Sequence, residues 1–206
     1  MSTENSPAKI VNKVVVVFDI CSSTRILEDL LQTENHEKWK NLLIGLKKFL
    51  IDRANDEKDF IIYKFLGDGY ILLFDWDYPA DDILTLLSDL CVWFDDRYSR
   101  TVRRFLDSTP NVEGMTFGID RGKLVRITMQ NKPEYVGRAI NVAARLQGSV
   151  EIKNRNPSSK ALLSRHYYSS VKASLSGYKV FSAKRKLRNV GNGGVINCNK
   201  VLLKSD

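Results

Sequence analysis

The sequence predicts an α+β fold in one domain, and three observations support this prediction. Short apolar runs rich in Val, Ile, Leu and Phe recur along the chain, as is typical of buried strands. Longer stretches between these runs carry apolar residues at helical spacing. The chain has 206 residues and is 43% hydrophobic, which is enough for one domain with a substantial core. We therefore expect a single domain at 13–206 after a polar tail at 1–12.

The N-terminal half is predicted to begin with a buried strand, because "KVVVVFDI" at 13–20 is a continuous β-branched run. Two helices should follow over 24–33 and 36–53, and the second repeats Trp, Leu and Phe side chains at helical spacing. The apolar segments 59–65 and 70–74 flank Gly-Asp-Gly, which is typical of the turn in a β-hairpin.

The C-terminal half should continue with a long helix over 80–106 and a strand pair at 113–122 and 123–129. A helix is expected at 139–150, and 151–168 should be polar and then helical. The last strands are expected in "GYKVFSA" and "VINCNKVLL". Strands with helices packed on one face, joined partly by hairpins, predict a ferredoxin-like βαββαβ palm with a C-terminal extension.

The composition argues against several classes of protein. No segment approaches the roughly 20 apolar residues that a membrane span needs. The N-terminus lacks the apolar centre of a signal peptide, so we expect a cytoplasmic protein. Cys21, Cys91 and Cys198 lie far apart without a CxxC motif, which favours free thiols in a reducing compartment. Two histidines make a His-based metal site or a Ser-His-Asp triad unexpected.

The net charge of +8 is concentrated at the C-terminal end of the chain. From residue 151 onward there are 12 Lys and Arg residues but only 2 Asp and Glu residues. Such a basic part could face nucleic acid, the phosphates of a nucleotide or simply water. Aromatic residues are present, but no nucleic-acid recognition motif accompanies them, so we do not expect nucleic acid as a partner.

Two aspartates could carry chemistry. Asp19 ends the first predicted strand, and Asp68 occupies the hairpin turn. In the ferredoxin-like order the first strand lies beside this hairpin, so the two carboxylates should face each other. Paired carboxylates repel unless a positive charge lies between them, and Mg²⁺ or Mn²⁺ suits two carboxylates plus substrate phosphates. Either aspartate alone would be interpreted as a strand-end or turn residue.

The start of the first helix could bind phosphate. Cys21, Ser22, Ser23 and Thr24 follow Asp19, where the free N–H groups of a helix N-terminus form an anion site. The three hydroxyl groups could instead cap the helix. A metal site beside a phosphate site is what phosphoryl transfer requires.

Four blocks in order, "VVVFDICSST", "KFLGDGYILLF", "FGIDRG" and "YVGRAINVAARL", resemble the class III nucleotidyl cyclase catalytic domain. The resemblance covers about 13–150 and extends more loosely to about 203. It implies a homodimer with its sites at the interface. It also implies that Asp19, Ile20 and Asp68 hold two Mg²⁺ or Mn²⁺ ions. The reaction would convert a nucleoside triphosphate to a 3′,5′-cyclic nucleotide and pyrophosphate.

The resemblance assigns further roles. Asn141 and Arg145 match helix residues that reach across the interface, where Asn141 would orient the ribose and Arg145 would stabilise charge on the α-phosphate. They are four residues apart and so share one helix face. Gly137 matches a glycine that lets the backbone turn into this helix. Arg188, in the basic segment "AKRKLRNVGNGG", would contact the outer phosphates.

Lys64 and Glu134 fall on the positions that the resemblance assigns to base recognition. Lys donates and Glu accepts hydrogen bonds, which argues against guanine and leaves adenine, cytosine and uracil open. The chain is almost only a catalytic domain and so resembles the stand-alone pyrimidine cyclases of Pycsar anti-phage defence. That reading implies cyclic UMP, or else cyclic CMP, read by a separate effector protein.

The alternative is a stand-alone adenylate cyclase that makes cyclic AMP. Polymerases and GGDEF-type diguanylate cyclases also use this palm, but the chain has no GGDEF-like run. A non-catalytic nucleotide-binding module is less expected, because both aspartates are present.

Overall fold

The computed structural model describes residues 7–57, 60–153, 156–188, 190 and 194–203. These residues form one sheet of eight strands. Its order is β2 (Phe60–Phe65), β3 (Gly69–Asp75), β1 (Lys9–Ile20), β4 (Met115–Met129), β6 (Lys160–Ser164), β8 (Val195–Leu202) and β7 (Val180–Lys186), with β5 (Lys132–Val136) paired to β4 outside this path. The order β2-β3-β1-β4 confirms the ferredoxin-like palm that the sequence predicted.

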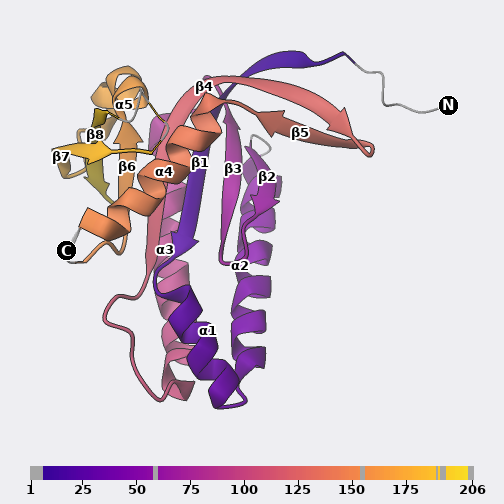
Figure 1. Ribbon diagram of the computed structural model, residues 1–206, viewed down its shortest axis with the longest axis vertical. Helices are drawn as coiled ribbons and strands as arrows, with labels where there is room; N and C mark the ends of the chain where they lie inside the picture. The colour runs from indigo at the N-terminus through magenta and orange to yellow at the C-terminus, as the bar shows by residue number, and fades with distance from the viewer. Residues whose placement is uncertain (1–6, 58–59, 154–155, 189, 191–193, 204–206) are drawn as a thin grey trace.

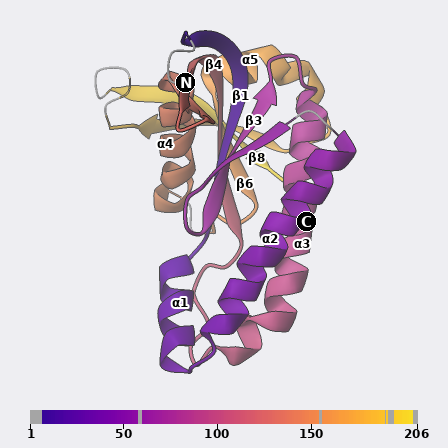
Figure 2. The same cartoon turned by 90° about the vertical axis from the view of Figure 1, so that its right-hand side faces the viewer.

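Helices cover both faces of this sheet, so the prediction that they pack on one face was wrong. The helices are α1 (Ser23–Gln32), α2 (His36–Glu57), α3 (Ala80–Thr101), α4 (Arg138–Lys153) and α5 (Arg165–Val171), with short 3₁₀ turns η2 (Arg103–Phe105) and η3 (Lys172–Leu175). Figure 2 shows α2 and α3 on one side of the sheet and α4 on the other.

The cause of this two-sided packing lies in β1. Val14, Val16 and Phe18 face the layer of α2 and α3, whereas Val15 and Val17 face α4. A strand that is apolar at every position buries both of its faces, and the valine run is such a strand.

β4 is one strand of 15 residues, where the sequence predicted two paired strands. Gly122 does not end it, because this residue continues the pairing with Lys13 of β1. The hairpin turn comes later, at Gln130 and Asn131, which both have positive φ. The distal half of β4 and the whole of β5 form an arm that projects from the body (Figure 1). We call it the β4–β5 arm.

Two other differences concern the start of β1 and a strand that was not predicted. β1 begins at Lys9, four residues before the predicted start, while residues 1–6 of the expected tail lie outside the described residues. β6 lies in a stretch that was predicted to be polar and then helical. It is stabilised on both edges, because it pairs in parallel with β4 and antiparallel with β8.

Two expectations about the whole chain can also be compared with the structure. Cys21, Cys91 and Cys198 are buried thiols that form no disulfide bond, as predicted. No helix among the described residues is long and apolar enough to cross a membrane.

Candidate active site

Asp19 and Asp68 come together where β1 ends beside the β2–β3 hairpin. Asp19 follows Val15 and Val17 on the face of β1 that carries α4. The antiparallel register pairs Asp19 with Gly69, the residue directly after Asp68. The Asp68 carboxyl group lies close enough to that of Asp19 to raise its pKa. The structure therefore brings together the two aspartates that the sequence singled out.

The electrostatics of this pair favour a bound positive charge. The pKa of Asp19 is raised from 3.8 to about 8. Burial is the largest cause, and a hydrogen bond with Asp68, the charge of Asp68 and the charge of Glu151 add to it. The N–H of Ile20 opposes this rise through a hydrogen bond. Two carboxylates in one partly buried site can both ionise only when a cation replaces the shared proton.

The glycines around Asp68 are required by the backbone. Gly67 has a φ of +105°, which L side chains rarely adopt. A Cβ added to Gly69 would lie 2.9 Å from the Cα of Asp19 and inside the carbonyl group of Phe18. Only glycine at this position lets the hairpin approach β1 closely enough for the carboxyl groups to meet.

The hydroxyl groups before α1 do not cap this helix, and that alternative was wrong. Ser22 has a φ of 57°, and its hydroxyl donates to the carbonyl of Val112 at 2.8 Å. Ser23 donates to the carboxylate of Asp68. The N-terminus of α1 has no side-chain cap, so the N–H groups of its first turn remain suited to a phosphate.

Cys21 fits the predicted phosphate site less well than its neighbours. Its side chain is buried, and its backbone N–H donates to the carbonyl of Gly114 at 2.8 Å. This N–H is therefore engaged within the protein, which leaves Ser23 and Thr24 at the start of α1 as the better candidates for an anion.

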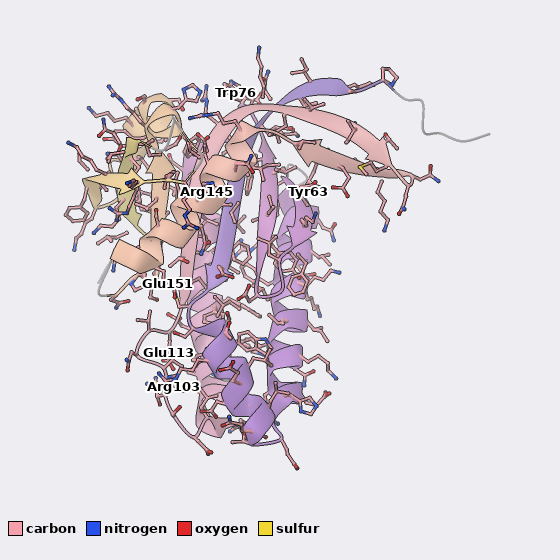
Figure 3. The ribbon with its side chains drawn as sticks, in the orientation of Figure 1. Tyr63, Trp76, Arg103, Glu113, Arg145 and Glu151 are labelled. Carbon is pink, nitrogen blue, oxygen red and sulfur yellow. The ribbon has the colours of Figure 1, made fainter. Side chains whose placement is uncertain are left out.

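Asn141 and Arg145 lie on α4, with Asn141 exposed and Arg145 half-buried. Figure 3 shows Arg145 midway along α4 and Glu151 near its C-terminal end. No ion pair within 4.0 Å joins Arg145 to Asp19 or Asp68 among the described residues. Within one chain, the structure thus does not bring the arginine to the aspartate pair.

α4 is held very close to the sheet at one point. Gly118 of β4 faces the helix, and a Cβ added there would meet the carbonyl oxygen of Ala143 and the N–H nitrogen of Gln147. The side chain of Gln147 donates to the buried hydroxyl of Thr116 at 2.8 Å. Gly137, directly before α4, also has no room for a side chain, because an added Cβ would lie 2.8 Å from the carbonyl oxygen of Lys123.

Glu134 is joined to β2 through a tyrosine that sequence reasoning missed. The hydroxyl of Tyr63 donates to the Glu134 carboxylate at 2.5 Å and accepts from the N–H of Tyr135 at 3.0 Å. Burial and this bond to Glu134 raise the pKa of Tyr63. Lys64 is the next residue along an irregular stretch of β2, and it is exposed. No ion pair joins Lys64 to Glu134 within the described residues.

Arg188 lies in the connection between β7 and β8, beside α4. Leu187 and Val190 on either side of it belong to a buried cluster with Val142 and Leu146 of α4. Arg188 itself is exposed, so it could reach a ligand at this side of the helix. Residues 191–193, which belong to the Gly-rich part of this connection, lie outside the described residues.

The residues present fit a hard divalent cation, although they form an incomplete ligand set. Among the described residues, no group of three His, Cys, Asp or Glu side chains could hold a metal ion. Asp19 and Asp68 supply two carboxylates, and Mg²⁺ commonly takes one or two protein carboxylates and completes its ligand set with water and substrate phosphates.

Comparisons with known proteins bear on the fold. In sequence, the chain matches no family model and no curated protein. In structure, it is similar to the adenylyl cyclase CyaB from P. aeruginosa, with a TM-score of 0.69 and 17% identity over 98% of both chains. An adenylate/guanylate cyclase/hydrolase from Silicibacter pomeroyi has a TM-score of 0.66 and 20% identity over 95% of this chain and 99% of that one.

A third similar structure is an adenylate cyclase from Trypanosoma brucei in its monomeric state. It has a TM-score of 0.68 and 17% identity, and the match covers 94% of this chain and 89% of that chain. The chain therefore has the fold of class III adenylyl and guanylyl cyclase catalytic domains over nearly its whole length.

Proposed function

We propose that residues 13–206 form the catalytic domain of a class III nucleotidyl cyclase, which converts a nucleoside triphosphate to a 3′,5′-cyclic nucleotide and pyrophosphate. The observation that carries this proposal is the register of Asp19 with Gly69, which leaves two carboxyl groups in contact beside the uncapped N-terminus of α1. A carboxylate pair next to a phosphate site is the arrangement that phosphoryl transfer uses.

The candidate site residues each have a defined task in the proposed reaction. Asp19 and Asp68, with the main chain at Ile20, would hold two Mg²⁺ or Mn²⁺ ions. When bound, these ions would neutralise charge on the triphosphate and make the ribose 3′-hydroxyl a better nucleophile. Ser23 holds the Asp68 carboxylate in one orientation through its hydrogen bond. The first turn of α1 would bind phosphate oxygens through its N–H groups.

The remaining tasks fall to α4 and the β7–β8 connection. Asn141 would orient the ribose, and Arg145 would stabilise the charge that builds on the α-phosphate as pyrophosphate leaves. Arg188 would contact the outer phosphates. Because Arg145 forms no ion pair with either aspartate of its own chain among the described residues, we propose a homodimer in which each site takes aspartates from one subunit and α4 from the other.

We further propose that the base is a pyrimidine, with UTP favoured and CTP as the second choice. Glu134 offers an acceptor and Lys64 a donor, a combination that does not suit guanine. The rings of Tyr63 and Tyr135 pack edge to face beside Glu134 with centroids 5.2 Å apart, and such a bulky wall favours the smaller ring. A cyclic pyrimidine nucleotide would serve as an anti-phage signal for a separate effector. The alternative is an adenylate cyclase.

The first experiment incubates purified protein and Mn²⁺ with ATP, GTP, CTP or UTP and identifies the products by mass spectrometry. Cyclic UMP or cyclic CMP as the main product would support the pyrimidine proposal, and cyclic AMP would replace it with the adenylate alternative. No cyclic product from any of the four would contradict the cyclase proposal itself.

A substitution pair tests the site. Asp68→Ala should abolish turnover while the protein remains folded, because a turn carboxylate contributes little to the core. Asp75→Ala is the matched control, since it removes an exposed carboxylate from the far end of β3, the strand that follows Asp68. Retained activity in Asp68→Ala would rule out the proposed metal ligands.

Mixing two inactive proteins tests the shared site. Asp68→Ala and Arg145→Ala subunits should together recover about a quarter of the wild-type activity, because half of the dimers are mixed and each mixed dimer has one complete site. No recovery, with subunit exchange verified by a tagged subunit, would mean that both residues act within one chain.

A further inference from the structure

A groove on the far side of α4 from the β4–β5 arm has no role in the proposed reaction. It consists of two adjoining hollows of about 520 and 420 Å³, which share Arg165, Ser169 and Asn197. We call them together the α5 groove. Figure 1 shows α5, β7 and β8, which line it, grouped on one side of α4. This is also the part of the chain where the sequence concentrates positive charge.

The α5 groove contains three cations without an acidic partner in contact. Arg138 comes from the first turn of α4, Arg165 from α5 and Lys184 from β7. None of them has a carboxylate within 4.0 Å among the residues that the structure describes. Ser182 and Asn199 add further hydrogen-bond donors to the larger hollow. This donor set suits a phosphate group.

The smaller hollow ends on a buried carboxylate. Asp120 is 1% exposed, and its Oδ1 accepts from the hydroxyl of Ser164 at 2.5 Å. Its Oδ2 is buried and has no hydrogen-bond partner. Burial raises the pKa of Asp120, while hydrogen bonds from Ser164 and from the backbone N–H of Arg121, followed by the charges of Arg138 and His166, act to lower it. An unpaired buried acceptor is costly, and an N–H group from a ligand would satisfy it.

We infer that the α5 groove binds a nucleoside monophosphate. The phosphate would lie in the larger hollow between Arg165 and Lys184, and an N–H of the base would donate to Asp120 in the smaller one. Val142 and Ile196 provide apolar walls for the base in the smaller hollow. A ligand with an anionic group at one end and an N–H donor at the other matches both hollows, whereas inorganic phosphate matches only the first.

Occupation of the groove would act on α4. Arg138 and Val142 line the smaller hollow, and the same helix carries Asn141 and Arg145. A bound nucleotide would fix the first turns of α4 and thereby change the position of these two residues. This regulatory step rests on the proposed cyclase function, whereas the binding itself does not.

Calorimetric titration of Asp68→Ala protein in EDTA with AMP, GMP, CMP, UMP and inorganic phosphate tests binding without turnover. At least one monophosphate should bind with a Kd below about 1 mM. The double substitution Arg165→Gln with Lys184→Gln should weaken binding of this monophosphate at least tenfold. Lys47→Gln with Lys48→Gln is the matched control, because it removes the same charge from exposed sites on α2. Asp120→Asn should change which base binds best.

Several results would overturn the inference. These are no binding of any monophosphate, equal binding of inorganic phosphate, or equal weakening by the control substitutions. Binding of a single-stranded oligonucleotide but of no monophosphate would make the groove a nucleic-acid surface instead. In wild-type protein, the monophosphate that binds should change the rate of cyclic nucleotide formation, and an unchanged rate would overturn the coupling through α4. Loss of cyclase activity in all proteins, with binding intact, would contradict only the proposed function.

Discussion

The contact between Gly118 and α4 allows the position of this helix, which carries Asn141 and Arg145, to be changed by one methyl group. In Gly118→Ala the new Cβ would lie 2.0 Å from the carbonyl oxygen of Ala143. Ordinary van der Waals contact begins at 3.4 Å, so α4 would have to retreat by about 1.4 Å. The obstructing atoms belong to the backbone, so no change of side-chain rotamer can relieve the clash.

The expected effect on activity is large and the effect on stability moderate. A displacement of about 1 Å between reacting groups can cost about 100-fold in rate, so we expect kcat to fall by about that factor. Overpacking typically costs about 1–3 kcal/mol, and the free energy of unfolding should fall by a similar amount. The fold should persist, because the change lies at one crossing point.

The assay combines initial rates of cyclic nucleotide formation with denaturant unfolding followed by circular dichroism. Gly148→Ala is the matched control on α4 itself, because nothing lies within 4 Å of its added Cβ. It should leave turnover unchanged and stabilise the protein by roughly 0.5–1 kcal/mol through helix propensity. Wild-type turnover in Gly118→Ala would refute the idea that the contact of α4 with β4 positions Asn141 and Arg145.

Three further predictions concern the carboxylates. In EDTA, the melting temperature should fall as pH rises from about 4 to about 8, because the pKa of Asp19 is raised to about 8 in the folded state and the folded protein binds the extra proton. Asp19→Asn should flatten this slope, and an equal slope in both proteins would contradict the assignment. Tyr63→Phe should raise KM roughly tenfold with little change in kcat, since it removes the donor to Glu134; an unchanged KM would separate this tyrosine from base binding. Ser23→Ala should raise the Mn²⁺ concentration for half-maximal activity about tenfold, because it releases the Asp68 carboxylate; unchanged metal dependence would count against that role.

The central sheet and the aspartate pair could be predicted because their signals are local. The valine run marks β1, and Gly67, Asp68 and Gly69 mark the hairpin. Once the order of strands is ferredoxin-like, the proximity of Asp19 to Asp68 follows from topology alone.

The missed elements depend on contacts between distant segments. β6 has only five residues in a polar stretch, and it exists because β4 and β8 pair with its two edges. The sequence predicted separate strands at 113–122 and 123–129, but β1 pairs with β4 on both sides of this boundary and keeps it one strand. The bond between Tyr63 and Glu134 joins residues 71 positions apart, and an irregularity in β2 beside Tyr63 has no sequence signature.

The place of β1 between β3 and β4 has a consequence for synthesis on the ribosome. Every residue from Val14 to Phe18 is at most 2% exposed in the folded chain. β3, which pairs with one edge of β1, emerges from the ribosome early. β4, which pairs with the other edge, begins only at Met115, so that edge stays uncovered while all of α3 is made. Open apolar edges promote aggregation. A chain cut before Met115 would keep both aspartates and their hairpin, yet could not cover the strand that holds them.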